Sequence, residues 1–225
     1  MYGIKNITTD KWVGLFFHTP KTGGSNIIHQ LKSDDAFDIH IMTSVLPFDE
    51  TLLKEMPVND EGHLTIDQAF KLFPTLDDWI DRYNIDVFTL TRDPYERFIS
   101  CMRFLPTAMR LNEDSDGISL YESLTPSEFH RRITTTNFSP QSYWNCRDGK
   151  PFARRIRLED IIGQKKVHLC EECYVDFTQT IWSLEQASEQ IHDNSYVIPK
   201  FTLDEETKKF VQWLWKDDFK NPLVR

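Results

Sequence analysis

The sequence contains no run of apolar residues long enough to span a bilayer, and its first residues contain no cleavable signal peptide. We therefore expect a complete cytoplasmic protein of bacterial or viral origin, with no membrane span. An excess of basic charge is also missing: the formal net charge is −9, which argues against a nucleic-acid partner. The 225 residues, of which 40% are hydrophobic, suffice for a single domain over residues 1–225 with a sizeable core.

Cysteine is scarce, with four residues in all, and only two of them form a C-x-x-C motif. Cys170 and Cys173, with His168 nearby, could make a redox pair or half of a zinc site. A second C-x-x-C, which would complete a zinc site, does not occur in the sequence. We therefore expect Cys101, Cys146, Cys170 and Cys173 to be reduced structural thiols.

Two common nucleotide-binding signatures are missing as well. The pattern G-x-x-x-x-G-K-[ST] fails because Lys21 precedes Gly23 and Gly24 instead of following them, and G-x-G-x-x-G does not occur. The segment FFHTPKTGGSN (residues 16–26) nevertheless lies between an apolar strand and an amphipathic helix. A glycine turn that leads into a helix N-terminus directs backbone N–H groups and a positive dipole at an anion. With the charge of Lys21 and the hydroxyls of Thr22 and Ser25, the segment predicts a site for a phosphate or a phosphosulfate.

A second strand-to-helix junction follows the apolar run VFTLT (residues 87–91). It reads Arg92-Asp93-Pro94, and a helix carries Ser100 about two turns further on. Pro94 suits the first turn of that helix, and Asp93 before it is a natural N-cap. Arg92 therefore lies at a strand end, where its planar guanidinium can pair two phosphate oxygens.

Strands and helices alternate along the chain, which predicts an α/β fold with a central, mainly parallel sheet flanked by helices on both faces. The expected strands are 11–18, 37–42, 87–91 and 167–169. The expected helices are 25–32, 65–73, 76–83, 95–104 and 203–219, with a further helix starting at Thr125 and one or two within 174–192. A short helix and a loop are expected over 48–60.

The two junctions resemble the cofactor motifs of sulfotransferases that use 3′-phosphoadenosine 5′-phosphosulfate (PAPS). Residues 20–25 (PKTGGS) resemble the 5′-phosphosulfate loop, and R-D-P-x-x-R-x-x-S, which starts at Arg92, resembles the 3′-phosphate motif. The resemblance implies a P-loop-like sulfotransferase fold in which Arg92 and Ser100 bind the 3′-phosphate and Lys21 stabilises the leaving oxygen. It implies no metal. The residues that would hold the 5′-phosphate are Thr22, Gly23, Gly24, Ser25 and Asn26.

A weaker resemblance concerns the general base. His63-Leu64-Thr65 resembles an H-L-T element of carbohydrate sulfotransferases, among which the heparan and dermatan 2-O-sulfotransferases take a histidine from this region as the base. The resemblance makes His63 the expected base, with His29 and His40 as competitors. His18, just before the loop, is expected to brace it.

The resemblance implies transfer of a sulfuryl group to an acceptor hydroxyl of a carbohydrate. Two alternatives stay open: a non-catalytic module that binds PAP (3′-phosphoadenosine 5′-phosphate, the product) or a glycan, and a nucleotide-dependent kinase. Tyr143, Trp144 and Phe152 are available as a shelf for the adenine, and Gln141 could contact its edge. The basic residues that either form a groove for an anionic polymer or belong to a solvated loop are Arg147, Lys150, Arg154, Arg155 and Arg157.

Overall fold

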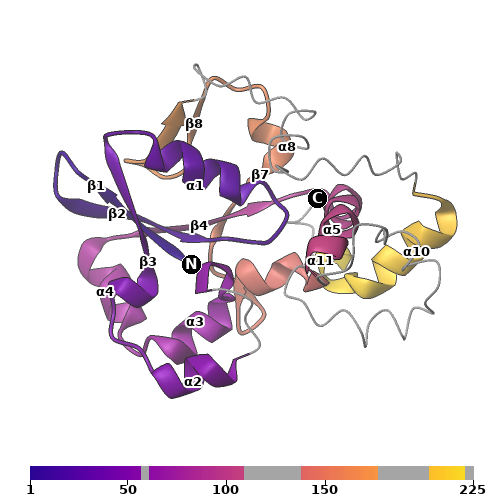
Figure 1. Cartoon of the computed structure of the whole chain (residues 1–225), viewed down its shortest axis with the longest axis horizontal. Helices are drawn as coiled ribbons and strands as arrows, with labels where there is room; N and C mark the ends of the chain where they lie inside the picture. The colour runs from indigo at the N-terminus through magenta and orange to yellow at the C-terminus, as the bar shows by residue number, and fades with distance from the viewer. Residues whose placement is uncertain (57–60, 109–137, 177–202, 221–225) are drawn as a thin grey trace.

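The structure of the protein is a computed structural model that describes residues 1–56, 61–102, 138–176 and 203–220 in full and residues 103–108 as helical backbone. It is an α/β protein built on a five-stranded sheet of order β3-β1-β2-β4-β7 (Figure 1). The strands are β1 (Tyr2–Asn6), β2 (Lys11–Phe17), β3 (Phe37–Ile41), β4 (Asp86–Thr91) and β7 (Arg154–Arg157). The neighbours β2, β4 and β7 are parallel, whereas β1 is antiparallel to both β2 and β3.

The sheet is therefore mixed and not wholly parallel. The antiparallel strand β1 was not among the expected strands. The chain forms β1 by pairing its first residues with β2 through a polar turn, in which the Thr9 N–H donates to Asn6 Oδ1 at 3.0 Å. Gly3 in β1 fits under Trp12 and Met42: an added Cβ would lie 2.8 Å from the Met42 sulfur. These tertiary contacts stabilise β1 as a strand. They could not be predicted from the sequence of this short segment.

Helices cover both faces of the sheet, as expected. One face carries α1 (Gly24–Lys32), α8 (Leu158–Ile161) and the hairpin of β8 (Lys166–His168) and β9 (Tyr174–Asp176), and the other carries α2 (Glu50–Glu55), α3 (Ile66–Leu72) and α4 (Leu76–Tyr83) (Figure 1). Neighbouring residues of β2 separate the two cores: Phe16 packs in the first and Phe17 in the second. This division follows from the alternation of side chains along a strand.

Local capping explains why several helix ends were predicted correctly. Thr65 and Gln68 form a reciprocal capping box at the start of α3. Asp93 accepts the N–H groups of Tyr95 and Glu96, at 2.9 and 3.1 Å, at the start of α5 (Pro94–Ala108). Each of these interactions joins residues no more than three positions apart, so sequence alone reveals them.

Two expected helices were wrong in extent. Residues 203–219 do not form one helix but α10 (Glu205–Leu214) and α11 (Lys216–Lys220), which break at Trp215, where the indole N–H donates to Phe138 O at 2.7 Å. The segment Tyr174–Asp176 is strand β9, because the chain folds back onto β8. The expected helix at Thr125 lies outside the described residues, as does the rest of 174–192.

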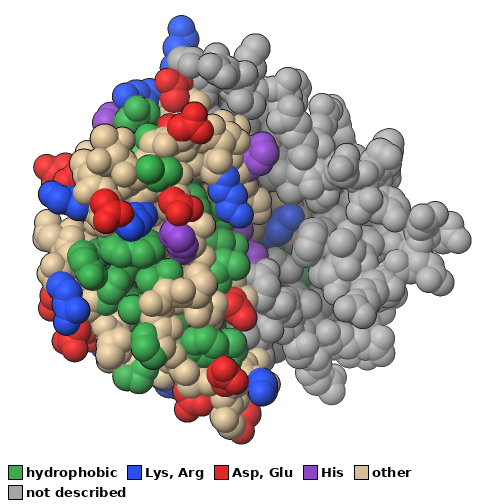
Figure 2. Space-filling model, turned by 60° about the vertical axis from the view of Figure 1, so that its left-hand side comes forward, with side chains coloured by type: hydrophobic (Ala, Val, Ile, Leu, Met, Phe, Trp, Pro, Cys, Tyr) green, Lys and Arg blue, Asp and Glu red, His purple; other side chains and the backbone are tan. Residues whose placement is uncertain are grey.

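The described surface next to the β1–β2–β3 edge carries charges of both signs among apolar side chains (Figure 2). Ile7, Ile41 and Tyr83 are exposed large apolar residues. Within the described ranges, no helix is both long enough and apolar enough to cross a membrane.

A buried arginine connects α5 to distant segments. Arg97 is fully buried; its Nε donates to Pro20 O at 3.0 Å and its Nη1 to Ser139 O at 2.9 Å. Its guanidinium lies over the Trp215 ring, 4.6 Å from the centroid. Burial lowers the pKa of Arg97, whereas the nearby Asp218 raises it. One side chain thus links the loop before α1, the segment before residue 141 and the C-terminal helices.

We expect Arg97→Met to lower the free energy of unfolding by roughly 2–4 kcal/mol, because Pro20 O and Ser139 O lose their donors. Urea denaturation followed by circular dichroism measures the loss. The matched control is Arg82→Met on α4, where the arginine is exposed; it should stay within about 0.5 kcal/mol of wild type. Equal losses in the two variants would contradict a structural role for Arg97.

Candidate functional site

The loop between β2 and α1 has the backbone of an anion-binding turn. Gly23 is the N-cap of α1 at φ 85°, and Lys21 is also left-handed at φ 64°. A left-handed non-glycine residue is uncommon and costs about 1–2 kcal/mol, so the surrounding contacts must hold Lys21 in place. The N-cap of α1 makes no side-chain hydrogen bond. Within the first turn of α1, the N–H of Asn26 donates to Gly23 O at 3.1 Å, so the N–H groups before Asn26 are the ones that an anion could use.

The threonines of this loop stabilise the loop itself. The Thr22 hydroxyl donates to Thr19 O at 2.8 Å, and the Thr19 and Thr89 hydroxyls lie 2.8 Å apart. The hydroxyl that was expected to reach a ligand from Thr22 is thus occupied within the loop, and the backbone N–H is the group left to Thr22 for that task. Ser25 is exposed and Asn26 is half-buried, so both side chains lie toward the surface.

His18 braces the loop, as expected. It is buried, and its ring packs so close to the start of α1 that a Cβ on Gly24 would lie 2.2 Å from His18 Cδ2. Only glycine fits at position 24. Burial lowers the pKa of His18 well below its usual value, and the charges of His63, the N-terminus and Lys21 act in the same direction. His18 is therefore a neutral packing group.

The second junction is held by Gln141, which lies in the 3-10 turn η4 (Gln141–Trp144). Its Oε1 accepts the Arg92 N–H at 2.8 Å, and its Nε2 donates to Arg92 O at 2.9 Å. Asp218 in turn accepts the N–H groups of Gln141 and Ser142, at 2.9 and 3.0 Å. The side-chain amide of Gln141 fixes backbone in both directions, so the expected contact of Gln141 with an adenine edge was wrong.

The structure brings the two junctions together. Since β2 and β4 are adjacent and parallel, with Phe17 paired to Thr89, both strands end at the same edge of the sheet. The pKa of Lys21 is lowered to about 8, mainly by burial; the nearby Cys101 opposes this effect, and the charge of Arg92 adds a smaller lowering. Two cations therefore lie within electrostatic range of each other, which is the arrangement expected of a site for an anion.

Cys101 of α5 borders the same site, and Ser100 precedes it in sequence. Ser100 is half-buried, and Cys101 after it is fully buried. Burial raises the pKa of the Cys101 thiol, while the charges of Arg97, Lys21 and Arg92 lower it. The predicted anion ligands Lys21, Arg92 and Ser100 are thus on elements that meet in one region. Arg92 also lies 3.6 Å from Glu96, an i,i+4 pair at the surface.

His63 is the histidine that the fold brings to the loop. It ends the 3-10 turn η2 (Glu61–His63); its Nδ1 donates to His18 O at 2.9 Å, and its ring centroid is 4.2 Å from that of His18. The indole of Trp144 donates to His63 O at 3.1 Å. Because a carbonyl only accepts, the proton is on Nδ1, and Nε2 is the nitrogen that takes up a second proton.

The competing histidines lie elsewhere. His29 is exposed on α1, and His40 on the edge strand β3 is 2.9 Å from Asp38 and packs against Trp12. Neither has a contact with the β2–α1 loop in the described part of the chain. Of the three candidates for the base, only His63 is held by the backbone of that loop.

The basic residues that were considered as a groove do not share one surface. Arg147 forms a bidentate pair with Asp77 at 2.8 and 3.0 Å and lies over the Phe70 ring. Arg154 and Arg155 are neighbours on β7, so their side chains point to opposite faces; Arg154 donates to Leu169 O. The remaining two are Lys150, which is exposed, and Arg157, which lies 3.7 Å from Glu159. Of the two alternatives left open by the sequence, a continuous groove of all five is therefore the one that the structure does not support.

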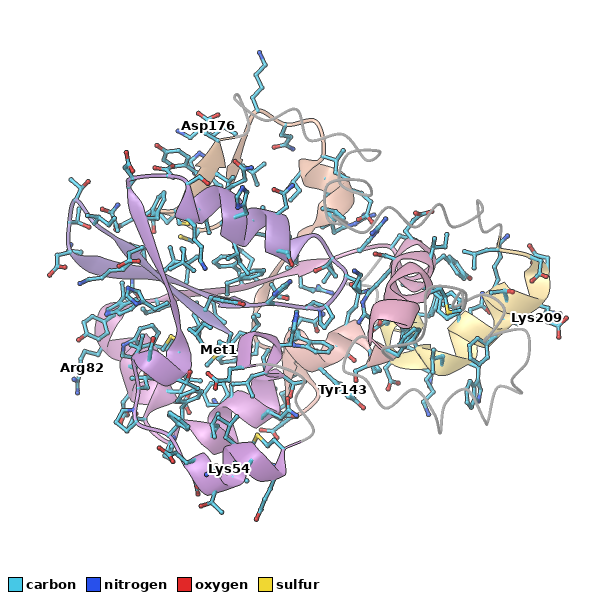
Figure 3. All side chains as sticks on the ribbon, in the orientation of Figure 1. Met1, Lys54, Arg82, Tyr143, Asp176 and Lys209 are labelled. Atoms are coloured by element: carbon cyan, nitrogen blue, oxygen red, sulfur yellow. The ribbon has the colours of Figure 1, made fainter. Side chains whose placement is uncertain are left out.

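Among the aromatic candidates for a base shelf, Trp144 is fully buried, and Phe152 packs edge-on against Phe70. Tyr143 is 51% exposed and lies in η4, which contacts both α3 and α11 (Figure 3). Tyr143 is thus the one of the three whose ring is available at the surface. In the described ranges no three His, Cys, Asp or Glu side chains gather as metal ligands.

Three residues of the site region escaped the sequence analysis: Arg97, Gln141 as a clamp, and Asp218. Arg97 stands within the R-D-P-x-x-R motif, so its position was visible, but its burial was not. The chain matches no protein-family model, no curated protein and no solved structure. What the site does is therefore inferred from its own residues.

We expect Lys21 to titrate with a midpoint of about 8 and expect Arg92→Met to raise that midpoint, because a nearby positive charge is removed. Carbon NMR of lysine labelled at Cε, followed against pH, measures the midpoint. Arg82→Met on α4 is the control and should leave the midpoint unchanged. The convergence of the two junctions is contradicted if Arg92→Met also leaves it unchanged.

Proposed function

We propose that this chain is a sulfotransferase that moves a sulfuryl group from PAPS to an acceptor hydroxyl of a carbohydrate, on a P-loop-like sulfotransferase fold. The observation that supports this most is the meeting of Lys21 and Arg92 at the carboxyl edge of β2 and β4. PAPS carries two separate anionic groups, the 5′-phosphosulfate and the 3′-phosphate. Two cationic strand-to-helix junctions on adjacent strands suit one ligand of that kind, and ligands of α/β sheets bind at this edge.

The β2–α1 loop would hold the 5′ side. Backbone N–H groups from Thr22 to the first turn of α1 suit a phosphate, since the loop is already curved around Gly23. Sulfuryl transfer is an in-line displacement in which negative charge grows on the oxygen that joins sulfur to the 5′-phosphate. Lys21 would stabilise that charge, and its half-buried position strengthens the effect.

Arg92 and Ser100 would hold the 3′-phosphate. The clamp by Gln141 fixes the backbone of Arg92 and so limits where its guanidinium can reach. The contact between Arg92 and Glu96 is a surface i,i+4 pair, and such pairs contribute well under about 1 kcal/mol. A bidentate phosphate can therefore compete with Glu96 for the Arg92 guanidinium.

His63 would take the proton of the acceptor hydroxyl. Its Nδ1–H is held by His18 O, which leaves Nε2 as the basic atom and fixes the plane of the ring. The same contact ties the base to the loop that carries Lys21. His18 would be a much weaker base, because burial lowers the pKa of its ring well below the usual value.

The donor site is tested by thermal unfolding with PAP and, separately, with ATP plus magnesium. PAP at about a hundred times Kd should raise the Tm by roughly 5–10 °C. Arg92→Met should weaken PAP binding by about 10- to 100-fold, because a charge-assisted hydrogen bond is lost, and Arg82→Met should bind like wild type. Above pH 8 the affinity of the wild type for PAP should fall, because Lys21 loses its proton there in the protein without PAP, whereas binding of the anion requires the charged lysine.

The sulfotransferase proposal fails if PAP does not shift the Tm, and a larger shift with magnesium and ATP favours a kinase. Lys21→Arg is the control for the pH dependence. Its guanidinium stays charged, so its affinity for PAP should not change with pH in this range.

The base is tested by transfer of radiolabelled sulfate from PAPS to a panel of soluble oligosaccharides. His63→Ala should slow transfer by roughly a hundred- to ten-thousand-fold with PAP affinity unchanged. His29→Ala, which changes an exposed histidine on α1, should keep wild-type rates. If His63→Ala transfers sulfate at the wild-type rate, His63 is not the base. If the wild type binds PAP but transfers sulfate to no saccharide, a non-catalytic binding module is favoured.

A further inference from the structure

The C-x-x-C motif lies in the turn that joins β8 to β9, away from the candidate site. The N–H groups of Leu169 and Cys170 both donate to Cys173 O, at 2.8 and 3.1 Å, which closes the turn tightly. The N–H of Glu171 donates to Asp86 Oδ2 at 2.9 Å and so fastens the turn to the first residue of β4. Arg92 follows the last residue of β4. Six extended residues separate it from Asp86, which corresponds to about 20 Å.

This turn brings the two thiols together. Cys170 and Cys173 are the first and last residues of the C-x-x-C turn, and the hydrogen bond from the Cys170 N–H to Cys173 O, 3.1 Å long, holds their backbones side by side. Both cysteines are free thiols. The Cys173 side chain and the backbone N–H groups of Glu172 and Cys173 lower the pKa of the Cys170 thiol against the effect of burial, which favours its thiolate.

We propose that Cys170 and Cys173 form a redox-active dithiol that a small peroxide converts to a disulfide. The Cys170 thiolate attacks one oxygen of hydrogen peroxide, which gives a sulfenic acid on Cys170 and releases hydroxide. The Cys173 sulfur then attacks the sulfenic sulfur, so that the S–S bond forms and water leaves. The two thiols lose two electrons in total, and the peroxide gains them. The adjacent positions of the cysteines in one closed turn suit the short span of a disulfide.

The titration behaviour of the pair agrees with these roles. The hydrogen bond from Cys173 lowers the pKa of the Cys170 thiol, against the effect of burial, whereas the same contact and burial raise the pKa of Cys173. Cys170 is also the more accessible of the two thiols, since it is 3% exposed and Cys173 is fully buried. We therefore assign Cys170 as the nucleophile and Cys173 as the resolving thiol. Burial raises the pKa of the thiols of Cys101 and Cys146, so the chain contains its own unreactive controls.

Burial also selects the oxidant. Cys170 is 3% exposed and Cys173 is fully buried, in the core cluster that includes Ile27 and Leu31 of α1. A water-sized peroxide can reach such a sulfur more easily than glutathione disulfide or a maleimide can. We therefore expect oxidation by hydrogen peroxide to be faster than labelling by a bulky maleimide.

Two thiolates could also supply half of the ligands of a tetrahedral zinc ion, so the zinc content of the purified chain is measured as well.

The test treats the purified full chain with hydrogen peroxide and locates the products by peptide mass spectrometry. Wild type should give one internal disulfide between Cys170 and Cys173, while Cys101 and Cys146 stay reduced. In Cys173→Ser the reaction should stop at a sulfenic acid on Cys170, which dimedone traps. In Cys170→Ser no sulfenic acid should form at Cys173. Cys146→Ser is the matched control and should keep the disulfide.

The proposal is overturned if peroxide oxidises Cys146 or Cys101 first, if Cys173 carries the sulfenic acid, or if stoichiometric zinc accompanies the purified chain. The wild-type mapping alone decides the first and third of these, even where a serine variant does not fold. None of the readouts involves PAP or a saccharide, so failure here is distinct from failure of the proposed transferase.

Discussion

The burial of a single guanidinium, that of Arg97, determines how the distant parts of this chain meet. A buried positive charge is costly unless every N–H finds a partner. Arg97 obtains its partners from Pro20 O and Ser139 O and packs on the Trp215 ring, so three segments far apart in sequence must come to it. The loop that carries Lys21 is one of them. The position of Lys21 relative to α5 is thus a consequence of satisfying an arginine that itself faces no solvent.

The local parts of the fold could be predicted because neighbours in sequence decide them. The N-cap at Asp93 was predicted correctly, and the helix expected from Thr65 starts there because Thr65 and Gln68 form a capping box; both interactions lie within one helical turn. The strand β1 and the break at Trp215 depend on contacts with distant residues, on Gly3 beneath Trp12 and on the indole hydrogen bond to Phe138. No pattern within either segment contains that information.

The candidate site divides in the same way. The sequence was sufficient to place Lys21 and Arg92 at strand ends, and the fold brings these ends together. It was not sufficient to show which polar atoms are already used. The hydroxyl of Thr22 and the side-chain amide of Gln141 have the chemistry of ligand contacts, yet both are occupied by backbone groups. The choice of His63 over His29 also depends on the fold, through the hydrogen bond to His18 O.

The clamp on Arg92 has a consequence for the order in which the protein is made. Gln141 holds the backbone of Arg92, and Asp218 on α11 holds the backbone of Gln141. The strands β2 and β4 leave the ribosome long before α11 does. A nascent chain can therefore pair β2 with β4 early, but the backbone of Arg92 gains its full support only after α11 has emerged. Arg97, which holds the Lys21 loop, also packs on Trp215, so both cationic junctions are completed by the segment that contains α10 and α11.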